Sequence, residues 1–222
     1  MAAEVDICNL ALAYLGDSAQ VVSIYPPDGS AQSGHCSRFF PVALGQLLEL
    51  HAWGFATTRV ALASVTNLSS TWKYAYAAPS DVLNYLGVLA SDAADDYSVG
   101  VQMANTIVGQ VSSGLGNYTP QAFQVEKNLD GSEVILTNQE NAVLRYTAAI
   151  SDASKLTPLA TEALARLLAS KLAGPVLKGA EGRNESMAQL QLFQKVLEKA
   201  TESDANQRRE KVTQGAPWMV NR

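Results

Sequence analysis

The sequence predicts an α+β fold: an antiparallel α-helical bundle with a β-rich insertion between its N-terminal and C-terminal helices. Apolar residues recur at helical spacing near both ends of the 222-residue chain. The middle of the chain instead carries β-prone runs and a strong turn signal. The chain therefore divides into a helical bundle core (1–55 and 151–206), a β-rich insertion with one short helix (56–150) and an extended C-terminal tail (207–222).

Two helices are predicted in the first 55 residues. The first spans Glu4–Tyr14 and ends at Gly16, a residue type that suits the left-handed conformation found just after a helix. A loop follows, with the turn sequence Pro-Pro-Asp-Gly at 26–29. The second helix spans Ser30–Leu50 and carries a broad apolar stripe. Pro41 lies inside it, removes one backbone donor and is expected to kink it.

The first half of the insertion is predicted to contain a strand and the short helix. A period-two pattern over 56–65 predicts the strand. Ser80 and Asp81 precede a predicted helix over 81–89, because a serine oxygen accepts an amide hydrogen bond at a helix start and an acidic side chain suits its positive end. Residues 91–120 contain three aspartates and a Gly/Ser-rich run, and they are predicted to leave the core as an irregular or partly stranded segment.

The second half of the insertion carries a hairpin signal. Asp130-Gly131 separates two β-prone runs. This predicts a hairpin with a type I′ turn, since such a turn needs positive φ at both central residues. A further strand over 142–149 is predicted to extend the same sheet.

Two long helices are predicted after residue 150. Thr157 followed by Pro158 is typical of a helix start, and Gly174-Pro175 is predicted to stop or break that helix. The last helix is predicted over 184–205. Because neither helix is stable alone, both are expected to bury their apolar stripes against each other. In the last helix the stripe consists of Met187, Leu190, Phe193, Leu197 and Ala200.

Charge is unevenly distributed along the chain. The formal net charge is −5, to which residues 1–150 contribute −8 and residues 151–222 contribute +3. A nucleic-acid-binding protein usually carries a basic patch, since phosphate contacts supply most of its affinity. The acidic balance therefore argues against nucleic-acid recognition. It fits a surface that DNA slides past, and it also fits an ordinary solvated face.

The sequence gives few signals of compartment. No apolar run approaches the roughly 18 residues that cross a bilayer, and no basic stretch followed by an apolar one predicts a signal peptide. Cys8 and Cys36 both fall in helical patterns. They are predicted to be buried free thiols in a chain made in a reducing cytoplasm.

No motif in the sequence indicates catalysis, a metal ion or a cofactor. His35 and His51 are the only histidines, and neither has a second ligand at helical spacing. The glycine-rich run over 109–116 is not followed by Lys and Ser or Thr, so it is not a phosphate-binding loop. The sequence therefore predicts neither an enzyme nor a metalloprotein.

Two well-separated stretches carry a family resemblance. Residues 36–62 form a predicted helix that ends in an H-x-W-x-F-A element, at His51–Ala56, and continues into a strand. Residues 74–83 contain the pattern Y-x-Y-x-x-P-S-D. In this order and spacing the two stretches resemble the tail tubular protein A family of short-tailed phages. Shorter stretches at 134–138, 144–146 and 160–169 extend the likeness.

Members of that family are ring-forming adaptors between the portal of the capsid and the tail nozzle. The resemblance implies a structural virion protein of the tail or neck, assembled in the host bacterial cytoplasm. It implies a dodecameric ring whose channel passes DNA without sequence-specific binding. The implied partners are the portal protein, the nozzle protein and further copies of the chain, with no membrane and no cofactor.

The C-terminal tail has the composition of a docking peptide. It joins basic side chains to an aromatic anchor, and Trp and Arg commonly dominate interface energies. In the resembled family this segment tends to reach towards the portal, and it is expected to order only on assembly. The residues expected to dock are Arg208, Arg209, Lys211, Trp218, Met219 and Arg222.

Two alternatives remain open at the level of sequence. A head-completion protein that plugs the portal would dock by the same surface as an adaptor. A virion-associated peptidoglycan hydrolase would need a pair of carboxylates, one of them with a raised pKa. The carboxylates to test for that activity are Asp92, Asp95, Asp96 and Glu126, although the three aspartates also fit a solvated acidic loop.

Overall fold

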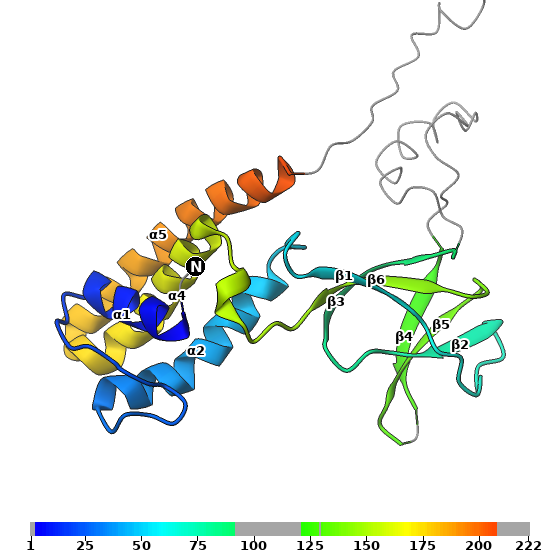
Figure 1. Ribbon diagram of the computed structural model, residues 1–222, viewed down its shortest axis with the longest axis horizontal. Helices are drawn as coiled ribbons and strands as arrows, with labels where there is room; N and C mark the ends of the chain where they lie inside the picture. The colour runs from blue at the N-terminus through cyan, green and yellow to red at the C-terminus, as the bar shows by residue number, and fades with distance from the viewer. Residues whose placement is uncertain (1–2, 92–120, 129, 208–222) are drawn as a thin grey trace, which may run out of the picture. The chain divides into compact units, whose positions relative to one another are not determined.

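The computed structural model describes residues 3–91, 121–128 and 130–207 (Figure 1). Within these residues the fold is mixed α+β, with four α-helices and two small antiparallel sheets. The described residues form two compact units. One, the helical unit, comprises 3–57 and 147–207; the other, the β unit, comprises the described part of 58–146.

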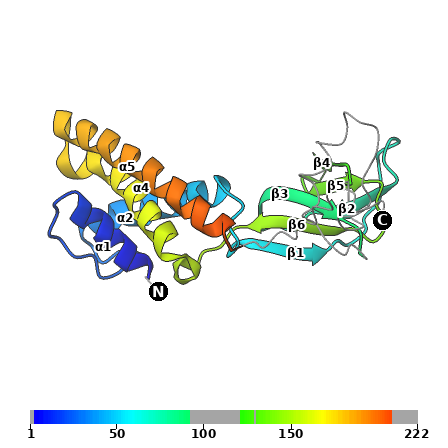
Figure 2. The ribbon, with the colours of Figure 1, turned by 90° about the horizontal axis from the view of Figure 1, so that it is seen from above.

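The helical unit contains α1 (Glu4–Tyr14), α2 (Ala31–Glu49), α4 (Pro158–Leu177) and α5 (Gly179–Ala205), with a short 3₁₀ helix (Ala153–Lys155) before α4. α4 packs against α5, α1 and α2 (Figure 2). Its central position explains why most of its residues are apolar and many of them are buried. Fully buried aliphatic side chains from these helices form the core, among them Ile7, Leu12, Leu47, Leu164, Leu168 and Leu172.

Side-chain caps fix where the helices begin. The Asp6 carboxylate accepts a hydrogen bond from the Ala3 amide at 2.8 Å, ahead of α1. Ser30 accepts from the Ser33 amide at the start of α2. Thr157 accepts from the Ala160 amide at the start of α4. These caps satisfy amides that have no partner within a helix, and the predicted starts of α1, α2 and α4 are confirmed to within one residue.

The loop between α1 and α2 is closed by Asp28. Its carboxylate accepts hydrogen bonds from the Ser30 hydroxyl (2.6 Å), the Ser30 amide (2.9 Å) and the Val22 amide (2.8 Å). These bonds, led by that from the Ser30 side chain, lower the pKa of Asp28 from 3.8 to about 2. The turn predicted at 26–29 is therefore held by one ionised carboxylate.

The prediction that Gly174-Pro175 ends a helix is wrong, because α4 continues to Leu177. The chain reverses later, at Lys178 and Gly179, which have φ of +58° and +59°. α5 follows at once and begins at Gly179, five residues before its predicted start. Gly182 lets the two helices approach closely: a Cβ at this position would lie 2.7 Å from the Ala173 carbonyl oxygen.

The apolar stripe predicted for α5 is partly wrong. Phe193 and Ala200 are buried, but Met187 is 60% exposed and Leu190 is 42% exposed. Buried positions on α5 instead follow Gly182, Gln189, Phe193, Ala200 and Asp204. This spacing, alternately of seven and four residues, marks a stripe narrower than that of an ordinary surface helix, so apolar side chains on its flank stay in contact with solvent.

A polar network joins three helices in the helical unit. The Arg166 guanidinium carbon lies 3.5 Å from the centroid of the Tyr14 ring, and Arg166 Nη1 donates to Gln189 Oε1 at 3.0 Å. Gln189 Nε2 in turn donates to Glu185 Oε1 at 2.7 Å. Because Gln189 is almost fully buried, these bonds satisfy polar groups that would otherwise destabilise the packing of α1, α4 and α5.

The β unit contains two three-stranded sheets. One has the order β1 (Thr57–Ala61), β6 (Val143–Ala148), β3 (Val82–Leu89). The other has the order β2 (Tyr74–Ala77), β5 (Glu133–Thr137), β4 (Phe123–Lys127). In the second sheet Tyr76 and Val125 are both register partners of Ile135. Ile135 is fully buried at its centre.

The helix predicted over 81–89 is wrong, because these residues form β3. The Ser80-Asp81 capping signal is local, whereas pairing with β6 is not, and tertiary pairing overrides weak propensity. Asp81 has a different role from the predicted one. It accepts a hydrogen bond from the Tyr146 hydroxyl at 3.0 Å, which ties the start of β3 to the neighbouring strand.

The strand predicted over 142–149 forms, but the prediction that it extends the hairpin sheet is wrong. It is β6 and lies between β1 and β3 in the other sheet. Asn141, just before it, has φ of +51°. This left-handed residue, of a type that tolerates the conformation, lies in the short connection where the chain passes from the second sheet to the first.

The hairpin predicted around Asp130-Gly131 is confirmed as β4–β5, but its turn is not type I′. The Gly131 amide donates to the Asn128 carbonyl at 3.0 Å, and the Asn128 amide donates to the Ser132 carbonyl at 2.8 Å. Of Asp130 and Gly131, only Gly131 has positive φ, at +82°. Such a longer loop, with a glycine in the left-handed region, is the next commonest hairpin connection.

Candidate functional site

The predicted docking residues lie outside the described part of the chain. These are Arg208, Arg209, Lys211, Trp218, Met219 and Arg222. The same is true of the acidic segment with Asp92, Asp95 and Asp96, and of the glycine-rich run at 109–116. Of the carboxylates named for hydrolysis, only Glu126 is described, on the exposed side of β4.

The described residues nearest the tail form an elaborate polar site at the end of α5. Asp204, in the last turn of that helix, is only 4% exposed. Its Oδ1 accepts a hydrogen bond from the Gly54 amide at 3.0 Å, and its Oδ2 lies 3.1 Å from His51 Nε2. One carboxylate thus holds two groups from the segment that follows α2, which precedes it by some 150 residues in the sequence.

That segment, residues 51–57, is called the connector here because it leads from α2 into β1. Trp53 is its fully buried anchor, and its indole Nε1 donates to the Leu47 carbonyl at 2.8 Å. The Trp53 carbonyl accepts from the Thr57 amide (2.8 Å) and hydroxyl (2.7 Å). The rings of His51 and Phe55 pack on Trp53, with centroids 4.8 Å and 5.4 Å away.

Gly54 allows the close approach of Asp204 to the connector. A Cβ at this position would lie 3.1 Å from Asp204 Oδ1, closer than an ordinary van der Waals contact. The H-x-W-x-F-A element is therefore a compact turn. Its Trp anchors it in the core, its Gly exposes an amide to the carboxylate, and its His makes the second contact.

The chain also returns to the helical unit at the connector. The Ala148 amide donates to the Ala56 carbonyl at 2.9 Å. The chain leaves the helical unit after Thr57 and re-enters it at Thr147. The connector, residues 147–148 and the last turn of α5 are therefore joined by hydrogen bonds. We call this arrangement the junction, and its members are His51, Trp53, Gly54, Ala56, Ala148 and Asp204.

Four of the six junction residues belong to the H-x-W-x-F-A element that the sequence singles out. His51 was expected to belong to the element that closes α2, and it does so. Asp204 was missed, although it lies four residues after the buried Ala200 and thus on the buried side of α5. An acidic residue on the core side of a helix is a signal, because a buried carboxylate needs hydrogen-bond donors nearby.

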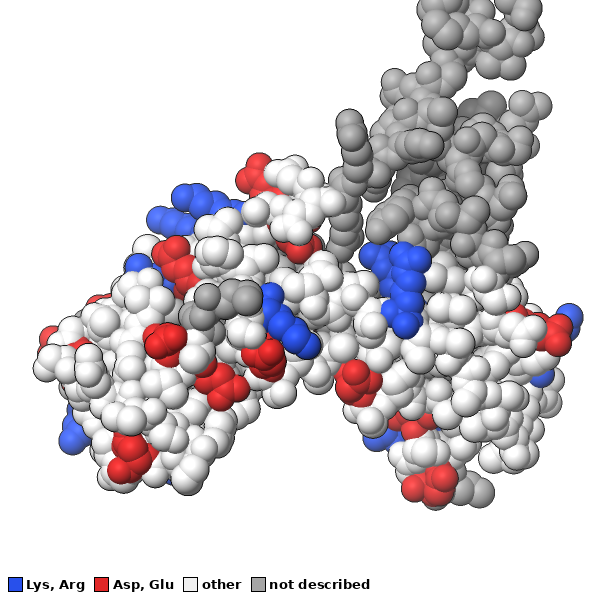
Figure 3. Space-filling model, viewed as in Figure 1, with Lys and Arg blue, Asp and Glu red and all other residues white. Residues whose placement is uncertain are grey.

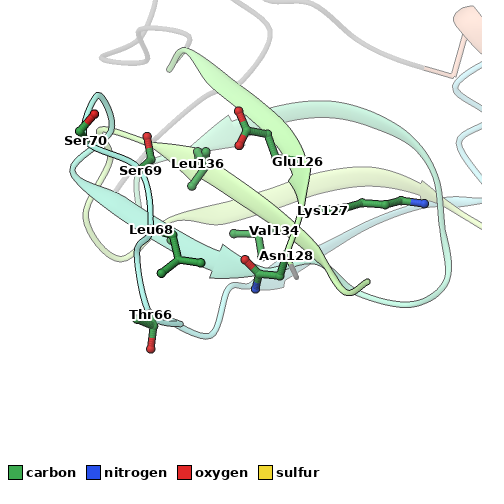
Figure 4. Close-up of a pocket in the computed structure, with 10 residues that line it drawn as sticks. Thr66, Leu68, Ser69, Ser70, Glu126, Lys127, Asn128, Val134 and Leu136 are labelled. Carbon is green, nitrogen blue, oxygen red and sulfur yellow. The ribbon is translucent and has the colours of Figure 1, made fainter. Parts of the chain in front are cut away.

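A shallow cavity lies beside the second sheet of the β unit (Figure 4). Ala75, Val134 and Leu136 form a buried cluster there, against which Val65 and Trp72 pack. The cavity measures about 350 Å³ and is bordered by residues 66–70 and by β4. Glu126 is the one acidic side chain among the described residues that line it. A glycosidase needs two carboxylates about 5–9.5 Å apart, so these lining residues provide half of such a pair.

The two cysteines are free and buried, as predicted. A hydrogen bond with Cys36, together with burial, raises the pKa of the Cys8 thiol. A thiol with a raised pKa is a poor nucleophile at neutral pH. Within the described ranges no three His, Cys, Asp or Glu side chains gather as metal ligands would.

Charged side chains of both signs are interspersed on the face seen in Figure 3, and most of the described surface in view is uncharged. No helix in the described part of the chain is both long and apolar enough to span a membrane. In comparisons with known proteins, no family model and no curated protein matches the sequence.

Proposed function

We propose that this chain is a structural virion protein, a ring-forming adaptor that joins a phage portal to a tail nozzle. The observation that carries the proposal is the set of contacts made by the connector. The H-x-W-x-F-A element, one of the two stretches on which the family resemblance rests, is an anchored turn in which His51, Trp53 and Phe55 each have a distinct contact. A motif in which every distinctive side chain has such a contact is stronger support for a family than a match of letters.

In this proposal the bundle core, the β-rich insertion and the C-terminal tail have separate tasks. Copies of the chain contact one another side to side through different surfaces, and such heterologous contacts close into a ring. The exposed Met187 and Leu190 on α5 support a surface that is covered on assembly, since exposed apolar side chains often mark interfaces. Each tail docks on one portal subunit, and because the tails belong to one ring, the ring binds the portal more tightly than a single tail would.

The proposed protein acts through geometry, without catalysis, cofactor or metal ion. DNA passes through its channel without sequence-specific contacts. The net charge of −5 supports this, because an acidic subunit lacks the phosphate-binding potential that would hold DNA in place. The protein belongs to the tail or neck of the virion and assembles in the host bacterial cytoplasm.

Native mass spectrometry of the purified chain mixed with its cognate portal tests this proposal. The expected result is a complex in which one adaptor chain is bound per portal subunit, with the chain alone largely monomeric. Release of soluble sugar from purified peptidoglycan, with no portal complex, would overturn it in favour of the hydrolase. Glu126→Gln would then show whether the cavity beside β4 is responsible.

A further inference from the structure

We infer that Asp204 is a positioning residue, through which docking of the C-terminal tail is transmitted to the connector. This inference rests on the proposed function, in which the tail binds the portal. The observation behind it is the position of Asp204, three residues before the end of the described chain and directly bonded to the start of the path into the β unit.

The first step of the argument is the rigidity of the helix end. The Asn206 amide donates to the Glu202 carbonyl at 3.1 Å, and the Gln207 amide donates to the Asp204 carbonyl at 3.1 Å. Hydrogen-bonded turns therefore continue to the last described residue. Asp204 therefore anchors the last turn that the structure describes.

The second step is that a carboxylate is an unfavourable choice at this position. The C-terminal end of a helix carries a partial negative charge, so an acidic side chain there is destabilising. Burial adds a desolvation cost. Ala200, one turn earlier on the same stripe, shows that a small apolar side chain fits this side of α5. The carboxylate therefore serves to hold donors in a fixed direction and does more than fill space.

The third step is what Asp204 holds. It binds the Gly54 amide and His51, and the connector binds the returning chain through the Ala56 carbonyl and the Ala148 amide. Restricted motion at the end of α5 is thus passed to the connector and, through the hydrogen bond between Ala56 and Ala148, to the returning chain. Docking of the tail is expected to slow local opening of the connector, which is a coupling between two sites.

Hydrogen–deuterium exchange of the full chain, with and without its cognate portal, tests this inference. In the wild type, portal is expected to slow exchange in the tail and, by about tenfold, in peptides that cover the connector. In Asp204→Ala, which removes the acceptor of the Gly54 amide, portal still slows exchange in the tail but no longer slows it in the connector. Glu202→Ala is the matched control, because it truncates an exposed acidic side chain in the same turn, and it should behave as wild type.

A pair of variants at His51 provides a second measurement if Asp204→Ala fails to fold. His51→Gln retains a side-chain donor for the carboxylate, so portal should still slow exchange in the connector. In His51→Ala most of this slowing should be lost. Equal slowing in these two variants would overturn the inference. Portal-dependent slowing of exchange in the connector of a folded Asp204→Ala would also overturn it, as would unchanged exchange in the wild-type connector while the tail is protected. A wild-type tail that portal leaves unprotected contradicts the proposed function itself.

Discussion

Alanine at Gly182 tests the closeness of α4 and α5. The new Cβ would lie 2.7 Å from the Ala173 carbonyl oxygen and 3.4 Å from the Gly174 Cα. Both are backbone atoms, so no side chain can rotate away, and the helices must separate by more than half an ångström at that point. Overpacking of this kind costs about 1–3 kcal/mol. The better helix propensity of alanine offsets about 1 kcal/mol of it.

Gly45 provides the matched control, because it lies inside α2 and a Cβ there would meet nothing within 4 Å. Gly45→Ala is therefore expected to raise the free energy of unfolding by about 0.5–1 kcal/mol. Gly182→Ala is expected to lower it by up to about 2 kcal/mol, and its Tm by about 2–4 °C for each kcal/mol. Urea unfolding followed by far-ultraviolet circular dichroism measures both. A Gly182→Ala protein as stable as Gly45→Ala would refute the close packing of these helices.

Three further predictions follow from the helical unit. Trp53→Phe leaves the Leu47 carbonyl without its indole donor and should destabilise by about 1–3 kcal/mol in the same assay; an unchanged midpoint would contradict this. The folded-state pKa of Asp28 is about 2, below its usual 3.8, so the stability contributed by its ionised carboxylate is complete above about pH 4 and is lost as pH falls towards 2. Asp28→Asn should make the free energy of unfolding less dependent on pH over that interval, and an unaltered dependence would contradict this. Arg166→Lys keeps the charge but loses the planar geometry that reaches Gln189; a loss of about 1 kcal/mol is expected, and no loss would show that the network contributes nothing.

Local signals in the sequence were sufficient for the starts of α1, α2 and α4. Ser30 and Thr157 accept hydrogen bonds from backbone amides at the starts of α2 and α4, and α1 has the bounds predicted from its periodicity. The same is true of the β4–β5 hairpin, whose strands are adjacent in sequence. In each case the residues that decide the structure are near neighbours, so composition and spacing contain the information.

Several of the failures involve partners that are distant in the sequence. β3 has a helix-like capping signal at Ser80, but pairing with β6 decides its conformation. Met187 lies on a helix with good apolar periodicity, and its exposure depends on how narrow the contact of α5 is. Asp204 is 150 residues from Gly54. No local pattern encodes these contacts, although an acidic residue at a core position of a helix is a usable warning of one.

Single-particle imaging of the chain with its cognate portal, with and without residues 207–222, tests the central claim most directly. The adaptor account predicts a closed dodecameric ring on the portal for the full chain and none for the truncated chain. A chain that forms no ring in either form would contradict the account. A ring that survives truncation would show that the docking contacts lie elsewhere than in the tail.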